Sequence, residues 1–392
     1  MFGDVLPIES VITAAYVHIP FCRRRCFYCD FPVSVLGDRR DGSNAQSVGQ
    51  YVEVLCQEIR TTLVEPGLAP LKTIFFGGGT PSLLTPKQLE QILTSLDRAC
   101  GIAPDAECSI EIDPGTFDLA KLQAFKALGI NRFSLGVQAF QNTLLQACGR
   151  SHTVADSFTA VEMLHSIGAK NWSLDLISGL PHQTLEDWQV SLEKAIALSP
   201  THLSCYDLVL EPVTAFGKQY EPGATPLPTD TLTAEMYRTA QAVLTTAGYQ
   251  HYEISNYAQP GAQCRHNLTY WHNQAYYGFG MGAASYTQGQ RFTRPRSRAT
   301  YYPWVAQGCP ITVAPQTTTD QLLETLMVGL RLAEGVDLGK FSAAQQTQIQ
   351  EAIAPYLATG WVKLRGNQLA LGDPDGFLFS NTILASLFEQ FD

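Results

Sequence analysis

Short apolar segments alternate with amphipathic segments along the first half of the chain, and this alternation limits the possible folds most strongly. The apolar segments are rich in β-branched and aromatic residues, which favour strands. The expected strands are Tyr16–Pro20, Thr73–Phe76, Cys108–Ile112, Arg132–Val137, Trp172–Ile177 and His202–Val209. The helices expected between them are Val48–Leu63, Pro86–Arg98, Leu119–Leu128, Val154–Ile167 and Leu185–Leu198. This order predicts an α/β fold whose parallel sheet closes into a partial (β/α)6 barrel.

The alternation ends near residue 287, and a different pattern follows. Helices are expected at Asp320–Leu332 and Ala343–Ala358, followed by a hairpin of Trp361–Leu364 and Gln368–Leu371. Helices followed by a hairpin are typical of a winged-helix module. A chain of 392 residues is long enough for one barrel and one smaller domain. We therefore expect a barrel domain at 1–287 and a smaller α+β, winged-helix-like domain at 288–392.

The composition limits the partners and the compartment. The formal net charge of -10 argues against a nucleic-acid partner, because surfaces that bind phosphates are basic. The sequence has no signal-peptide pattern and no apolar run of transmembrane length, although peripheral contact with a membrane stays open. The ten cysteines then belong to a reducing compartment, where clustered cysteines bind metals or act in catalysis. We expect a cytoplasmic protein.

Cys22, Cys26 and Cys29 follow the first expected strand with a CxxxCxxC spacing. Three thiolates from one loop can bind three irons of a [4Fe–4S] cluster, which leaves the fourth iron open to S-adenosylmethionine. Zinc is the alternative, but a structural zinc site normally takes four protein ligands. The remaining cysteines are scattered singly, which favours the cluster.

Polar residues and glycines stand at the ends of other expected strands. Gly78, Gly79 and Thr80 follow one strand, and glycines let a backbone approach a ligand closely. Glu111 and Asp175 stand in apolar strands, where a carboxylate is costly without a partner. A cationic sulfonium or ammonium group would be such a partner. The alternative is a structural role, such as pairing with Arg150.

These motifs resemble the radical S-adenosylmethionine superfamily, and within it the coproporphyrinogen dehydrogenase family that includes the HemN and HemW branches. The resemblance covers nearly the whole chain. It implies that Tyr16 and Tyr28 lie beside the cofactor. It also implies one or two S-adenosylmethionine sites formed by residues that match the family pattern, namely Gly78, Gly79, Thr80, Glu111, Gln138, Arg150, Asp175 and Val209.

The segment from His266 to Trp271, HNLTYW, matches the HNxxYW motif of the HemW branch. Asp30 and Phe31 after the third cysteine are also similar to that branch. The resemblance implies that His266 binds haem, since histidine is a common axial ligand. A hydrogen-bonded core histidine is the alternative, and Cys264 and His272 are neighbouring candidates for the ligand.

The HemW-like pattern implies a haem chaperone that binds haem and passes it to acceptor haemoproteins, without coproporphyrinogen oxidase activity. An electron donor for the cluster is also expected. The alternative is a working oxidase, which would convert two propionates to vinyl groups by hydrogen abstraction and decarboxylation. The acceptor and the electron donor cannot be identified from these motifs.

Overall fold

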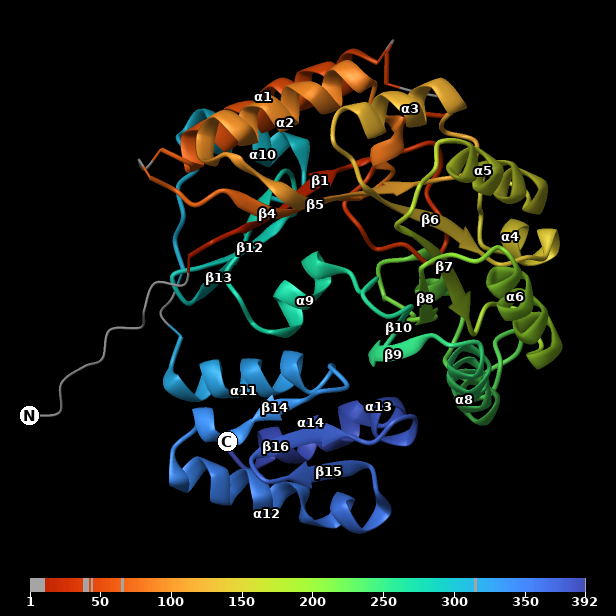
Figure 1. Ribbon diagram of the computed structural model, residues 1–392, viewed down its shortest axis with the longest axis vertical. Helices are drawn as coiled ribbons and strands as arrows, with labels where there is room; N and C mark the ends of the chain where they lie inside the picture. Colours follow the sequence, from red (N-terminus) through yellow and green to blue (C-terminus); the bar gives the residue numbers. More distant parts are fainter. Residues whose placement is uncertain (1–10, 38–41, 44, 65–66, 314–315, 392) are drawn as a thin grey trace, which may run out of the picture.

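The computed structural model describes residues 11–37, 42–43, 45–64, 67–313 and 316–391 (Figure 1). Its centre is a set of six parallel strands that are neighbours in chain order. They are β1 (Ala14–Ile19), β4 (Leu71–Gly78), β5 (Ile102–Ile112), β6 (Arg132–Gln138), β7 (Trp172–Ser178) and β8 (His202–Asp207). All six predicted strands are present, and the partial barrel is confirmed. The first ten residues, where no signal peptide is expected, lie outside the described residues.

Helices cover the outer face of these strands (Figure 1). Several begin at a threonine whose side chain accepts a hydrogen bond from the third helical amide, as Thr85, Thr153 and Thr184 do. These capping bonds fix where a helix starts after each loop. The helices are α1 (Gln46–Thr62), α2 (Pro86–Cys100), α3 (Leu119–Ala127), α4 (Asn142–Ala147), α5 (Val154–Ser166), α6 (Leu185–Ala197), α7 (Ala215–Gln219) and α8 (Asp230–Thr246).

Three further strands extend the sheet at its two edges. β11 (Tyr277–Phe279) pairs in parallel with β1, and β10 (Asn256–Ala258) pairs antiparallel with β8 and β9 (Gln250–Glu253). The sheet therefore ends at β11 on one side and β9 on the other, and the barrel stays open. The short helix α9 (Arg265–Trp271) lies between these edge strands in the chain and packs on β4.

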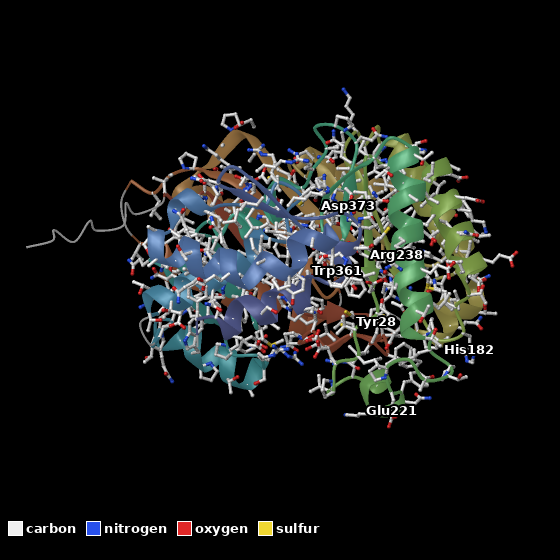
Figure 2. All side chains as sticks on the ribbon, turned by 90° about the horizontal axis from the view of Figure 1, so that it is seen from below. Tyr28, His182, Glu221, Arg238, Trp361 and Asp373 are labelled. Carbon is white, nitrogen blue, oxygen red and sulfur yellow. The ribbon has the colours of Figure 1, made fainter. Side chains whose placement is uncertain are left out.

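A second hydrophobic core lies in the C-terminal part of the chain, and Figure 1 shows this part below the barrel. A three-stranded antiparallel sheet in the order β14-β16-β15 packs with helices there, as expected for the winged-helix-like domain. Figure 2 shows Arg238 and Asp373 in the region where α8 meets this part. Its elements are α11 (Thr318–Gly329), β14 (Val336–Asp337), α12 (Ala343–Thr359), β15 (Val362–Arg365), β16 (Gln368–Leu371), α13 (Asp375–Leu378) and α14 (Ser380–Glu389).

The segment after residue 287 packs on the barrel before the second core begins. β12 (Ala284–Thr287) and β13 (Gln290–Thr293) form a hairpin, and α10 (Arg298–Ala306) follows. Arg294 and Glu58 form a buried ion pair with 2.8 Å between Nε and Oε1, and the Tyr301 hydroxyl donates to Glu58 at 2.5 Å. We therefore propose that the barrel domain extends through α10 to residue 306.

Candidate cofactor site

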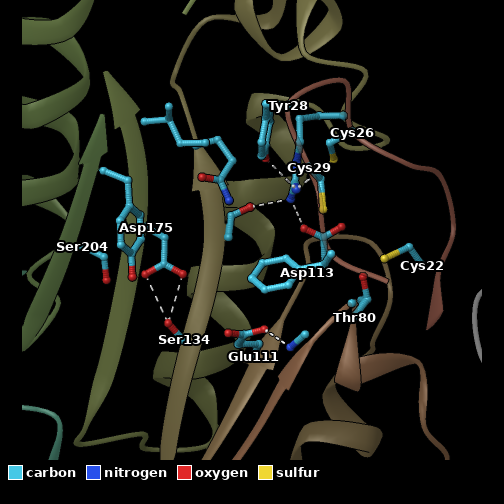
Figure 3. A pocket seen from close by; sticks show the side chains of 18 of the residues that line it. Cys22, Cys26, Tyr28, Cys29, Thr80, Glu111, Asp113, Ser134, Asp175 and Ser204 are labelled. Carbon is cyan, nitrogen blue, oxygen red and sulfur yellow. Dashed lines mark hydrogen bonds and ion pairs between the residues drawn. The ribbon is translucent and has the colours of Figure 1, made fainter. Parts of the chain in front are cut away.

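A cavity of about 510 Å³ lies at the carboxyl ends of the parallel strands. Every residue predicted for the cofactor site lines this cavity, except Tyr16 and His266. Figure 3 shows the cysteine side chains at one end, with Glu111 and Asp175 farther inside. The lining residues that the sequence predicted are Cys22, Cys26, Tyr28, Cys29, Gly78, Gly79, Thr80, Glu111, Gln138, Arg150, Asp175 and Val209.

The loop that carries the three cysteines is held by backbone hydrogen bonds. A short parallel pair, β2 (Phe21–Cys22) with β3 (Ser34–Val35), closes its two ends. In its middle the Phe27 amide donates to the Cys148 carbonyl at 3.0 Å. Burial raises the pKa of the Cys22 thiol to about 12. The Cys22 thiol is therefore protonated until a metal centre displaces the proton.

Arg150 ties the cysteine loop to the barrel. Its Nη2 forms an ion pair with Asp113 and donates to the Gly136 carbonyl at 2.9 Å. Its Nη1 lies 3.5 Å from the Cys26 sulfur and 3.4 Å from the Tyr28 hydroxyl. A buried cation beside a cysteine favours the thiolate that a metal needs. The sequence pointed to Arg150 but missed Asp113, which follows β5 directly.

The glycine run allows β4 to approach β1 closely. A Cβ on Gly79 would lie 2.7 Å from the Phe21 carbonyl oxygen, and one on Gly78 would lie 2.3 Å from the His18 ring. Gly78 also has a φ of +109°, which other residues rarely adopt. Its amide donates to the Glu111 carboxylate at 3.0 Å. The glycines thus place backbone amides at the cavity wall through contacts within the protein.

Glu111 and Asp175 are carboxylates buried in the cavity wall. Burial, and then repulsion from Asp175, raise the pKa of Glu111 to about 8. The hydrogen bond from the Gly78 amide lowers this pKa and offsets only part of the rise. Burial also raises the pKa of Asp175, although Ser134 Oγ donates to it at 3.0 Å. Ionised carboxylates in this setting gain from a cationic ligand. This charge arrangement suits the sulfonium and ammonium groups of S-adenosylmethionine.

Polar side chains alternate along three strands at the cavity wall, and the sequence prediction missed most of them. In β6, Arg132 and Ser134 line the cavity with Gln138, while the apolar residues between them are buried elsewhere. Gln138 ends this strand with a φ of 69°, a conformation often found at functional sites. The other lining residues of this kind are Ser173, His202, Ser204 and Tyr206.

Tyr16 lies behind the cavity wall. Its hydroxyl bonds to Nδ1 of His18 at 3.0 Å, and its ring stacks on Phe75 with 6.3 Å between centroids. Phe75 lines the cavity. Tyr16 therefore supports a wall residue in this structure, and its place beside the cofactor stays a prediction.

His266 is completely buried, outside the cavity lining. Its Nδ1 lies 2.9 Å from the Thr73 hydroxyl and its Nε2 lies 2.7 Å from the Tyr270 hydroxyl. Both ring nitrogens are engaged, so neither is free to coordinate iron in this conformation. This arrangement matches the alternative interpretation, in which His266 is a hydrogen-bonded histidine of the core. Burial lowers the pKa of His266 to about 3, which keeps the imidazole neutral.

Two neighbours of His266 were also considered as ligands. Cys264 is buried, and its sulfur lies 3.6 Å from a carboxylate oxygen of Glu107. The same carboxylate accepts bonds from the amides of Arg265 and His266, so it caps the start of α9. His272 is on the surface and pairs with Glu334 at 2.7 Å.

The donor set at the cavity fits an iron–sulfur cluster and S-adenosylmethionine. Three thiols from one loop stand at one end of a cavity whose wall carries two buried carboxylates. Among the described residues, no three His, Cys, Asp or Glu side chains gather around a single point as one metal ion would need. All ten cysteines are free thiols.

Comparisons with known proteins agree with this geometry. Residues 16–195 match the model of the radical SAM superfamily, and residues 316–378 match that of the HemN C-terminal domain. The protein named heme chaperone HemW from Synechocystis sp. is 50% identical over 402 aligned positions, which cover 96% of each chain. This chain belongs to the HemW family. The HemW of Bacillus subtilis is 38% identical over 84% of this chain and 86% of its own.

Family membership implies a [4Fe–4S] cluster and S-adenosylmethionine as cofactors. A solved structure of Escherichia coli HemN, titled a coproporphyrinogen III oxidase and a radical SAM enzyme, superimposes with a TM-score of 0.81. It covers 99% of this chain and 91% of its own at 23% identity, a likeness that establishes the fold alone. No helix among the described ranges is both long and apolar enough to cross a membrane.

Proposed function

We propose that this protein is a haem chaperone, which binds haem and passes it to acceptor haemoproteins. The observation that carries the proposal is the 50% identity, along nearly the full length, to a relative named heme chaperone HemW. The fold alone would fit the oxidase as well, since HemN shares it. The free cysteines support a reducing, cytoplasmic location.

In this proposal Cys22, Cys26 and Cys29 hold the cluster, and Arg150 positions Cys26 and Tyr28. Glu111 and Asp175 bind the cationic part of S-adenosylmethionine, and the remaining predicted lining residues complete its site: Gly78, Gly79, Thr80, Gln138 and Val209. A bound cluster supplies one-electron chemistry, which requires an external electron donor. Replacing Cys26 by Ala should abolish the cluster, as measured by iron content and electron paramagnetic resonance after anaerobic reconstitution.

The assignment of His266 as the haem ligand stays a prediction, and it requires a local change in conformation. Its ring can reach iron only if its hydrogen bonds to Thr73 and Tyr270 break. Titrating haemin into wild type and into His266→Gln compares their Soret bands. Gln can keep one hydrogen bond while removing the imidazole. An altered Soret band in a stably folded variant would support His266 as the ligand, and an unchanged band would exclude it.

The experiment that separates chaperone from oxidase is an anaerobic assay with reductant, S-adenosylmethionine and coproporphyrinogen III. The reconstituted protein should leave the substrate unchanged, with HemN as the positive control. Formation of protoporphyrinogen at a rate comparable to the control would overturn the chaperone proposal and favour the oxidase.

A further inference from the structure

Exposed apolar side chains gather at the mouth of the cofactor cavity. Phe31 is 50% exposed and Val209 is 63% exposed, and both line the cavity together with the half-exposed Tyr206. Phe31 comes from the cysteine loop, Tyr206 from the end of β8 and Val209 from the chain that follows β8. Single exposed apolar residues are ordinary, but a group at the mouth of a cavity marks a binding surface. We name Phe31, Tyr206 and Val209 the mouth rim.

Two exposed arginines surround Phe31. Arg25 donates to the Phe31 carbonyl at 3.2 Å and to the Cys29 carbonyl at 3.5 Å, and Arg296 donates to the Asp30 carbonyl at 3.3 Å. These acceptors are neutral carbonyl groups. Within the described ranges neither guanidinium forms an ion pair with a carboxylate. Each keeps spare donors, because a guanidinium carries five N–H groups.

The charge on the rim is asymmetric. The cysteine loop lines the cavity with Arg23, Arg24 and Arg25 and with one carboxylate, Asp30. Arg296 binds this loop from outside the cavity lining. On the other side Glu211 lines the cavity two residues after Val209. A ligand with an apolar body and anionic groups along one edge would therefore bind in one orientation, with its anions toward Phe31. The chain as a whole has a net charge of -10, so a local group of arginines contrasts with its overall negative charge.

We propose that the mouth rim binds the haem macrocycle, and that Arg25 and Arg296 bind its two propionates. Haem is flat and largely apolar and carries both carboxylates on one edge. Arginine is suited to carboxylates because its fork of N–H groups can donate two parallel bonds, and aromatic rings such as Phe31 pack on flat apolar faces.

The inference rests on the proposed haem-binding function and adds a location to it. It moves Val209 from the S-adenosylmethionine site to the haem-binding rim. It places haem at the mouth, away from His266, which lies outside the cavity lining. It also leaves Glu111 and Asp175 free for S-adenosylmethionine, because neither belongs to the mouth rim.

The test uses the full chain with its cluster reconstituted and two probes, haemin and haemin dimethyl ester. Esterification removes the propionate charges and leaves the macrocycle and iron intact. The double variant Arg25→Gln/Arg296→Gln should bind haemin roughly tenfold more weakly than wild type, because exposed charge pairs make modest contributions. It should bind the ester as wild type does.

Arg98→Gln/Arg365→Gln is the matched control, because it removes two exposed arginines from α2 and β15, neither of which belongs to the cysteine loop or the cavity lining. It should bind both probes as wild type does. Phe31→Ala tests the apolar part of the site and should weaken both probes. Iron content before each titration shows whether the cysteine loop, which Arg25 also contacts, is intact.

Two results would overturn the inference while the proposed function stands. One is haemin affinity in the arginine variant equal to that of wild type. The other is an equal loss for haemin and for its ester, which would point to a loosened loop. If wild type bound no haemin at all, the proposed function itself would fail.

Discussion

The imidazole of His266 stacks on the ring of Phe75, with centroids 5.4 Å apart and planes inclined by 25°. Phe75 lines the cofactor cavity and His266 does not. Phe75 therefore separates the imidazole of His266 from the cavity, whereas Asn267 of the same HNLTYW segment lines the cavity directly. Its histidine joins α9 to β4 through the Thr73 hydroxyl.

Replacing His266 by Ala should destabilise the protein. The change removes a buried ring and leaves the hydroxyls of Thr73 and Tyr270 without their partner, which together corresponds to roughly 2 to 4 kcal/mol. Chemical denaturation of the cofactor-free protein measures the loss. His266→Gln should lose less, because its amide can replace one bond. Equal stability of wild type and His266→Ala would show that these contacts contribute nothing.

Replacing Glu111 by Gln should make the cofactor-free protein more stable than wild type, and this difference should grow as the pH rises. Burial and the charge of Asp175 raise the pKa of Glu111 from 4.5 to about 8. The folded protein thus keeps a proton that the unfolded chain releases above pH 4.5. The contribution of Glu111 to the free energy of unfolding is therefore fully present below pH 4.5, and it is lost as the pH rises through 8.

The free energy of unfolding of Glu111→Gln should therefore exceed that of wild type by about 4 kcal/mol near pH 8 and match it near pH 4.5. Urea denaturation at the two pH values gives this difference. A constant difference across the range would contradict the raised pKa.

Binding of S-adenosylmethionine to the reconstituted protein should strengthen with pH. A cationic ligand favours ionised Glu111, so its affinity should rise by roughly fivefold from pH 7 to 8 and level off above the pKa. Calorimetric titration across this range measures the effect. Glu111→Gln should bind weakly and without this dependence. A Gln variant with wild-type affinity would remove Glu111 from the binding site.

Asp113→Asn should lower the cluster content. Arg150 would then keep its contacts with Cys26 and Tyr28 but lose its ion-pair partner, and breaking a buried pair costs about 3 to 5 kcal/mol. Iron counting after reconstitution measures the loss. Asp105→Asn, an exposed site on β5, is the control. Full iron occupancy in Asp113→Asn would show that the pair does not support the cysteine loop.

The strands and much of the cavity were predictable because local patterns determine them. Apolar runs gave the six strands, and parallel strands bring their carboxyl ends to one face. The period-two alternation of Arg132, Ser134 and Gln138 in β6 was also visible in the sequence, and it identifies a polar interior face. This alternation predicts that Arg132 and Ser134 face the cavity together with Gln138.

Long-range packing explains what the sequence did not reveal. The pairing of Asp113 with Arg150 joins residues 37 positions apart and depends on how two loops meet. His266 stands in a motif, but its burial depends on α9 packing against β4 from 193 residues away. The predicted boundary after residue 287 falls within the β12–β13 hairpin for a similar reason, since Glu58 binds Arg294.

Haem transfer tests the central claim most directly. The reconstituted protein, loaded with one equivalent of haem, is mixed with an excess of an apo-haemoprotein, and the acceptor's Soret band is followed over time. The proposed function predicts that the acceptor gains haem at a rate that rises with its concentration, as direct transfer requires. A rate equal to spontaneous haem release at every acceptor concentration, or no transfer at all, would contradict it.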